Sequence, residues 1–215
     1  MKKILCPSAL LFLFALLPPQ TTHAQSGSNF VQVTLPRGIE LKIPKGWWLL
    51  SADLNQAIQD SADVIIGLSG EGPPDGQETN LIAANSMPRS TYAAVRVSST
   101  IPPSVAPSEF ASITTADIRD LQSEMRQNFQ KLLPLQGNLL IEFLGTRIET
   151  ISGHPAVVTE YRRTSPEGPV FVQINQVFTF SQEIRISLSY RESEVALWKP
   201  VVEKIRRSIV IRPSP

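Results

Sequence analysis

Alternation of apolar and polar positions dominates the second half of the chain. Two stretches follow a period of two, which is typical of half-buried β-strands: Val170, Val172, Ile174, Phe178 and Phe180, then Ile184, Ile186, Leu188 and Tyr190. Turn sequences at 153–155, 165–168 and 181–182 divide the region from Leu139 to Arg191. We therefore expect an antiparallel meander here. Gln176 falls on the apolar face of its strand, where a buried amide needs a hydrogen-bond partner.

The first half of the chain predicts further strands. Residues 30–35 and 39–43 alternate around a turn at 36–38, and 81–85 and 91–99 flank a turn at 87–89. Between these hairpins, Pro44-Lys45-Gly46 interrupts the strand pattern, and residues 47–50 are expected to form a short apolar strand. Residues 67–78 and 101–107, rich in glycine, proline or both, are expected to be loops.

Helical spacing appears in three places. Ser51 precedes an amphipathic pattern over 52–66. A single apolar stripe is formed by Ile118, Leu121, Met125, Phe129 and Leu132. Thr114 and Asp117 stand before it at the spacing of a capping box. Ser193 is expected to cap a last helix with Trp198, Val201, Val202 and Ile205 facing inward, and Pro200 predicts a kink or a late start there.

Strands followed by helices, joined by hairpin-length turns, predict an α+β fold rather than a parallel α/β fold. We expect an antiparallel meander sandwiched by helices. The domain occupies residues 30–211, with a flexible leader at 25–29 and a tail at 212–215. About 190 residues after the first segment are enough for one domain that buries roughly 70% of its unfolded surface.

Residues 1–24 have the order of a secretory signal. Two lysines come first, an apolar run covers 9–17, and Thr22-His23-Ala24 places small residues where signal peptidase cleaves. The apolar run is too short to span a bilayer, which needs ~20 residues. We expect cleavage after Ala24, no stable membrane insertion, and a periplasmic or secreted protein. Cys6 would leave with the signal, so the mature chain would contain no cysteine.

Short motifs along the chain resemble those of PsbP-like domains, named after an extrinsic protein of photosystem II. Pro44-Lys45-Gly46-Trp47 is similar to the P-x-G-W segment that opens these domains. Features near their end are similar to Gly153-His154-Pro155-Ala156, to Trp198, Ile205 and Ser208, and to a last short strand at 209–211. The resemblance spans about residues 30–211. It implies an antiparallel sheet between helical layers and an accessory or binding role, mostly without catalysis, and it supplies no active-site residue.

Trp47 and Trp48 are neighbours in the short strand, so their side chains point to opposite faces. If helices cover both faces, both tryptophans belong to the core. If one face is open, we expect Trp48 to be exposed, because Trp47 occupies the family's P-x-G-W position. An exposed tryptophan is a natural anchor at interfaces, so Trp48 is the candidate partner-binding residue.

Candidate chemistry is sparse. After cleavage, His154 is the single histidine, and we interpret it as an exposed turn residue rather than a metal ligand or a triad member. Glu71, Asp75 and Glu78 do not match a calcium loop. The pairs Arg162-Arg163 and Arg206-Arg207 are expected on solvated faces, with contact to an anionic partner as the alternative. We therefore predict no catalytic residue, no metal and no cofactor.

Charge and composition restrict the classes of partner that the chain can bind. Two of the 20 basic residues and none of the 19 acidic residues lie in 1–24, which leaves 18 against 19 and a mature net charge of −1. That balance argues against a nucleic-acid binder. The leading hypothesis is an exported, non-enzymatic accessory protein that acts through protein–protein contacts. The alternatives are a small-ligand binder with a pocket between sheet and helix, covered by loop 67–78 or loop 100–108, and a carboxylate-dependent hydrolase.

Overall fold

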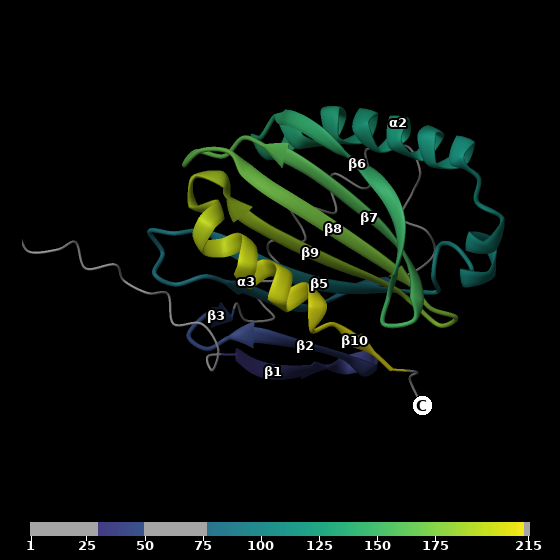
Figure 1. Ribbon diagram of the computed structural model, residues 1–215, viewed down its shortest axis with the longest axis horizontal. Helices are drawn as coiled ribbons and strands as arrows, with labels where there is room; N and C mark the ends of the chain where they lie inside the picture. Colours follow the sequence, from purple (N-terminus) through teal and green to yellow (C-terminus); the bar gives the residue numbers. More distant parts are fainter. Residues whose placement is uncertain (1–29, 50–76, 213–215) are drawn as a thin grey trace, which may run out of the picture.

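The computed structural model describes residues 30–49 and 77–212 (Figure 1). The signal segment, the leader, the predicted helix over 52–66, residues 67–76 and the end of the tail lie outside the described residues. Most of the described strands belong to one sheet with the order β3-β4-β5-β9-β8-β7-β6. They are β3 (Trp48–Leu49), β4 (Gln77–Asn85), β5 (Ala93–Ile101), β6 (Leu140–Ile151), β7 (His154–Arg163), β8 (Val170–Phe178) and β9 (Glu183–Arg191).

All neighbouring strands in this sheet are antiparallel, and β6 to β9 follow one another as a meander. The α+β class and the meander are therefore confirmed. A second sheet of three strands was not predicted: β1 (Phe30–Leu35), β2 (Ile39–Pro44) and β10 (Val210–Ile211). The resemblance implied a last short strand at 209–211, and β10 agrees with it. Its pairing with β2, a strand from the other end of the domain, is what no local pattern could indicate.

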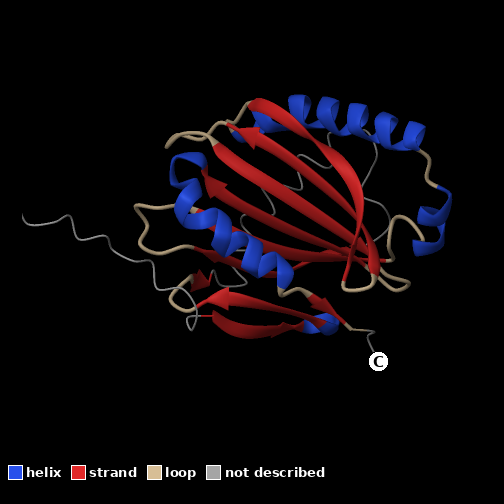
Figure 2. Ribbon diagram, in the orientation of Figure 1, coloured by secondary structure: helices blue, strands red, loops and turns tan. Residues whose placement is uncertain are grey.

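Helix α3 (Val195–Arg207) lies between the two sheets and contacts β9 on one side and β2 on the other (Figures 1 and 2). Its buried residues are Trp198, Val202 and Ile205, as the periodicity predicted. They join a core cluster that includes Leu41 of β2 and Leu188 of β9. Trp47 packs edge-on against Trp198 with ring centroids 5.8 Å apart. We call this side of the seven-stranded sheet the α3 face.

Helix α2 (Thr115–Leu132) packs on the opposite face, against β6. Its start is the predicted capping box, in which Thr114 Oγ1 accepts from the Asp117 amide and the Asp117 carboxylate accepts from the Thr114 amide. The apolar stripe is half-buried along its length and no α2 residue is fully buried. Phe129 stacks on Tyr161 of β7 at 4.2 Å. We call this side the α2 face.

The turn between β1 and β2 fastens the small sheet to the large one. The Arg37 guanidinium donates to the Ser99 carbonyl and hydroxyl oxygens and to Thr79 Oγ1, at 3.0–3.2 Å. Gly38, with φ +74°, follows in the same turn. A Cβ on Gly38 would lie 2.6 Å from the Arg212 carbonyl oxygen, so the close approach of the chain after β10 requires glycine.

Two local expectations were wrong, and one of the two alternatives for Pro200 is excluded. Ser193 makes no cap, because a 3-10 turn over Glu192–Glu194 precedes α3 and Glu194 is its N-cap residue, without a side-chain cap hydrogen bond. The helix begins at Val195, before Pro200, so a late start is excluded. Phe180 is 88% exposed, because β8 ends at Phe178 and the chain turns back over Thr179–Gln182.

Candidate functional site

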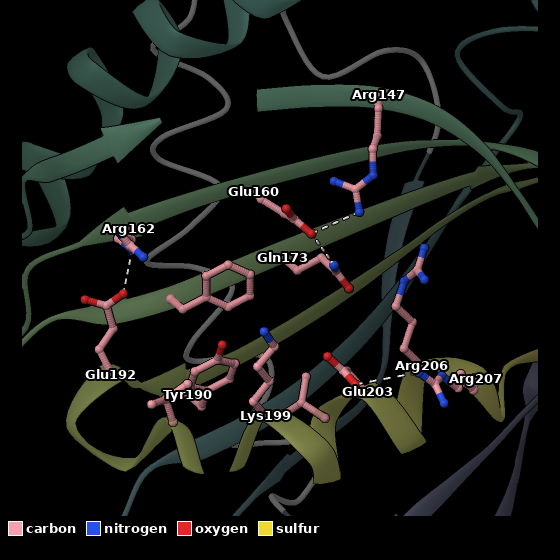
Figure 3. Close-up of a pocket in the computed structure, with 13 residues that line it drawn as sticks. Arg147, Glu160, Arg162, Gln173, Tyr190, Glu192, Lys199, Glu203, Arg206 and Arg207 are labelled. Atoms are coloured by element: carbon pink, nitrogen blue, oxygen red, sulfur yellow. Dashed lines mark hydrogen bonds and ion pairs between the residues drawn. The ribbon is translucent and has the colours of Figure 1, made fainter. Parts of the chain in front are cut away.

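A cavity of about 690 Å³ lies on the α3 face between helix α3 and strands β6 to β9 (Figure 3). Alternate residues of each strand point to the same face. This places Arg147 on β6, Glu160 and Arg162 on β7, Gln173 on β8 and Tyr190 on β9 in the lining. The helix contributes further charged residues to the opposite wall: Lys199, Glu203, Arg206 and Arg207.

The arginines of this cavity are held by carboxylates. Arg147 contacts Glu149 at 2.5 Å and Glu160 at 3.0 Å. Arg206 from α3 pairs with Glu149 of β6 and donates to Asn175 Oδ1 at 3.0 Å. This network connects the helix to the sheet.

Glu160 accepts two side-chain hydrogen bonds in this network, as Glu149 does. Glu160 Oε1 accepts from Arg147 Nη2 at 3.0 Å and from Gln173 Nε2 at 2.5 Å. Burial acts to raise the pKa of Glu160, but these hydrogen bonds and the nearby arginines outweigh burial and hold the pKa below its usual range. The carboxylate is therefore ionised at neutral pH.

Arg162 and Arg206 were expected on solvated faces. The Arg162 side chain is 40% exposed near the end of β7, as expected, whereas that of Arg206 is 24% exposed, so the expectation was wrong for Arg206. Arg162 donates to Glu142 Oε2 through Nη1 at 2.5 Å, and its Nε lies 2.5 Å from Glu192 Oε1 at an angle unsuited to a hydrogen bond. Both side chains are partly buried in the cavity network. Arg207 is exposed as expected. The sequence pattern could not indicate these pairs, because their glutamates come from other strands and turns.

Phe171 and Tyr190 form an aromatic floor in the cavity, stacked with ring centroids 5.0 Å apart. Burial and the carboxylates of Glu192 and Glu203 raise the pKa of Tyr190, so its phenol is neutral at physiological pH. Loop 100–108, expected as a possible cover for a pocket of this kind, contributes no residue to the described lining, and residues 67–76 lie outside the described part of the chain.

Trp48 lies at the edge of the same sheet, on the α2 face. Trp47 is 8% exposed and Trp48 is 43% exposed, so the two neighbours take the opposite faces that strand geometry predicted. The Arg89 guanidinium lies over the Trp48 ring at 4.4 Å from its centroid. Leu49 and Met87 beside them are also exposed. A cavity of about 310 Å³, lined in part by these Trp48, Met87 and Arg89 side chains, adjoins this surface.

The remaining candidate residues from the sequence are His154, Gln176 and the three acids of 71–78. His154 is half-buried at the β6–β7 turn, not fully exposed as expected. Gln176 lies on the α2 face and donates to Glu183 Oε1 at 3.1 Å, which is the structural hydrogen bond that its burial demanded. Glu78 accepts from Ser98 at 2.6 Å in β4, whereas Glu71 and Asp75 lie outside the described residues.

Two further kinds of feature, a membrane-spanning helix and a metal-binding cluster, are absent from residues 30–49 and 77–212. No helix in these ranges is long and apolar enough to cross a membrane. No group of three or more histidine, cysteine, aspartate or glutamate side chains in these ranges is arranged to hold a metal ion.

Comparison with family models and with curated proteins gives no match. Among solved structures, the chain is similar to the solution structure of cyanobacterial PsbP (CyanoP) from Synechocystis sp. PCC 6803. The TM-score is 0.52 and the identity 13%, over 91% of this chain and 99% of that one. The likeness to PsbP expected from the sequence is thus confirmed for the fold.

Two further structures were found with lower scores. A Pseudomonas aeruginosa protein of unknown function, described as a putative regulator, matches with a TM-score of 0.40 and 16% identity, over 87% of this chain and all of that one. LpqN of Mycobacterium tuberculosis, described as involved in cell envelope biogenesis, matches with a TM-score of 0.44 and 11% identity, over 86% and 91%.

Proposed function

We propose that this chain is an exported, non-catalytic accessory protein that binds a protein partner through the surface formed by Trp48 and Arg89. The observation that carries the proposal is the split between Trp47, which is buried, and Trp48, which is 43% exposed and covered in part by an arginine. The likeness to cyanobacterial PsbP supports the fold on which this surface is built.

The composition of the surface supports a protein partner. Tryptophan and arginine are the residues most enriched among interface hot spots. Met87 adds exposed apolar area beside them. β3 is an edge strand, paired with β4 on one side and with no other described strand on its outer side. A partner can therefore reach both the ring of Trp48 and the backbone edge beside it.

Export rests on the pattern of residues 1–24. The mature chain is expected to begin at Gln25. Mass spectrometry of the protein purified from its native host tests this directly. A chain that keeps residues 1–24, or that carries a lipid, contradicts the export proposal in this form.

The partner-binding proposal is tested by comparing Trp48→Ala with two controls. Trp48→Ala is expected to weaken partner capture from periplasmic extract by ~2 kcal/mol, about thirtyfold, while changing the urea midpoint little. Phe180→Ala removes an aromatic ring that is 88% exposed elsewhere on the molecule, so it should leave capture unchanged. Trp47→Ala should show the opposite pattern: it should lower the urea midpoint and leave partner capture by the folded protein nearly unchanged.

Two results would contradict the proposal. Equal destabilisation by Trp47→Ala and Trp48→Ala would place both tryptophans in the core. Equal loss of capture with Trp48→Ala and Phe180→Ala would mean that exposed aromatic rings bind extract proteins without specificity.

A second candidate function is the binding of a small ligand in the cavity on the α3 face. Its volume of about 690 Å³ favours this, because small-molecule sites measure roughly 300–1,000 Å³. Val195 lines the cavity and is exposed, so Val195→Trp would fill the cavity without opening the core. Native mass spectrometry should show a co-purified ligand in the original chain and not in Val195→Trp. A ligand retained by both would place it elsewhere.

A further inference from the structure

A second cavity, of about 550 Å³, lies on the α2 face and is built differently from the one beneath α3. Its lining comes from the turn after α2, from the β7–β8 turn, from the ends of β7, β8 and β9, and from Tyr92 just before β5. The residues that matter here are Tyr92, Asn138, Arg163, Val170 and Arg191. We call it the Arg163 cavity.

Arg163 enters this cavity because it follows Arg162 in β7 and points to the opposite face. Its Nη1 donates to Asn138 Oδ1 at 2.8 Å and to the Thr164 carbonyl at 3.0 Å. No carboxylate lies within ion-pair distance of Arg163 in the described part of the chain, and its Nε and Nη2 make no hydrogen bond there. A guanidinium has five N–H donors, so three of them are available to a ligand.

Unlike Arg163, the neighbouring residues Arg191 and Glu167 have ion-pair partners. Arg191 is nine-tenths buried and is paired with Glu194 at 2.6 Å and with Glu167. Only its Nε lacks a partner among the described residues. Glu167 also lines the cavity, and it shares Arg191 with Glu194, so these three groups together carry one net negative charge. Arg163 is therefore the cation in this lining without a counter-ion.

The pKa of the Tyr92 phenol responds to two nearby arginines. Burial alone would raise the pKa of its phenol, but Arg96, the hydrogen bond with Ser189 and Arg163 outweigh burial and hold the pKa below its usual value. Tyr92 lies on the α2 face between Arg96 and Arg163, and its hydroxyl is 3.2 Å from Ser189 Oγ. The positive potential that favours an anion is therefore local to the Arg163 guanidinium, which no carboxylate contacts among the described residues.

We propose that the Arg163 cavity is an oxyanion-binding site, in which the free edge of the Arg163 guanidinium holds a carboxylate or phosphate group. The planar fork of arginine matches two oxygens of such a group bidentately. Val170 and Pro166 supply apolar walls for a small organic body attached to the anion. The Arg163 cavity shares Tyr92 and Glu167 with the smaller cavity beside Trp48, but neither Trp48 nor Arg89 lines it, so the anion site does not depend on the proposed function.

The test is a titration of the purified protein with four probes, followed by calorimetry and by amide NMR signals. The probes are N-acetylglycine, its amide, inorganic phosphate and chloride at matched ionic strength. N-acetylglycine should bind with 1:1 saturation and shift the amides of Gly137, Asn138 and Ser165. The amide and chloride should bind at least tenfold more weakly. Binding of phosphate more tightly than N-acetylglycine would assign the site to a free inorganic anion, and the reverse order to an organic carboxylate.

Variants locate the site. Arg163→Gln should weaken N-acetylglycine at least tenfold, and Arg163→Lys should restore part of the affinity because it keeps the charge without the fork. Arg126→Gln is the matched control, since Arg126 lies over the Phe143 ring on the same face and outside the cavity lining, and it should bind as the original chain does. Trp48→Ala should also leave binding unchanged.

The proposal is overturned if no anion saturates the original chain, if the amide binds as well as the carboxylate, or if Arg163→Gln and Arg163→Lys both keep full affinity. Loss of structure in Arg163→Gln would show in its circular dichroism spectrum. In that case Arg163→Lys decides, because it is expected to bind more weakly than the original chain while staying folded.

Discussion

Arg162 and Arg163 are neighbours in β7, yet they meet opposite surroundings. Arg162 faces α3 and contacts two glutamates at 2.5 Å. Arg163 faces α2 and contacts an asparagine and a backbone carbonyl. The same contrast separates the two cavities: beneath α3 the arginines have carboxylate partners, whereas Arg163 has none among the described residues. In β7, the arginine on the α3 face therefore joins elements through carboxylates, and the arginine on the α2 face leaves a guanidinium edge available to a ligand.

The two faces also differ in how deeply their helices are buried. α3 lies between two sheets, and three of its residues are fully buried. α2 covers one side of the sheet with a stripe that is half-buried throughout. Equal amphipathic spacing in two helices therefore gives unequal contributions to stability, because burial depends on how many layers enclose the helix.

The largest expected effect is Trp198→Ala. Trp198 is 7% exposed, packs on Trp47 and donates through Nε1 to Glu194 at 3.0 Å. Truncating a buried aromatic residue costs about 3–5 kcal/mol, which is a large share of a typical stability of ~5–15 kcal/mol. Urea denaturation followed by circular dichroism measures the loss. An unchanged midpoint would mean that α3 is not held between the sheets as described.

Phe129→Ala makes the matching change on the α2 face. The ring stacks on Tyr161 but stays half-buried, so we expect a loss of about 2 kcal/mol, below the range for fully buried aromatic residues. The same urea experiment checks it. A loss equal to that of Trp198→Ala would show that the two faces contribute alike and would remove the contrast drawn above.

Acid should weaken the network beneath α3. The folded pKa of Glu160 lies below its ordinary value of 4.5, so its contribution is complete above about pH 4.5 and is lost as the pH falls through the folded pKa. Glu149 shifts in the same direction, since its bonds to Arg147 and Arg206 outweigh burial. The urea midpoint of the original chain should therefore fall more steeply between pH 5 and pH 3 than that of Glu160→Gln. Parallel curves would mean that the pair adds nothing to stability.

The smallest expected effect is that of His154→Ala. His154 is half-buried at a hairpin turn and lines none of the cavities described above. We expect a change within about 0.5 kcal/mol in stability, as for most surface substitutions, and unchanged partner capture. A large loss of capture by a folded His154→Ala protein would identify a functional histidine that the structure does not indicate.

Local pattern was sufficient to predict much of the fold. Alternation placed the meander strands β6 to β9, and helical spacing placed α2 and the inward residues of α3. The capping box of Thr114 and Asp117 was also predictable, because its two residues stand three positions apart. Adjacent residues in a strand must point to opposite faces, so Trp47 and Trp48 were bound to separate once one face was open.

Tertiary structure decided which strands and which charged side chains from distant parts of the chain pair with each other. β10 has two residues and completes a sheet with strands from the other end of the domain, which no periodicity encodes. The glutamates that hold Arg162 come from β6 and from the turn before α3. From the sequence alone Arg162 and Arg163 form a single basic pair. Their different partners follow from antiparallel pairing, which brings distant strands within 5 Å of each other and gives each face its own set of charges.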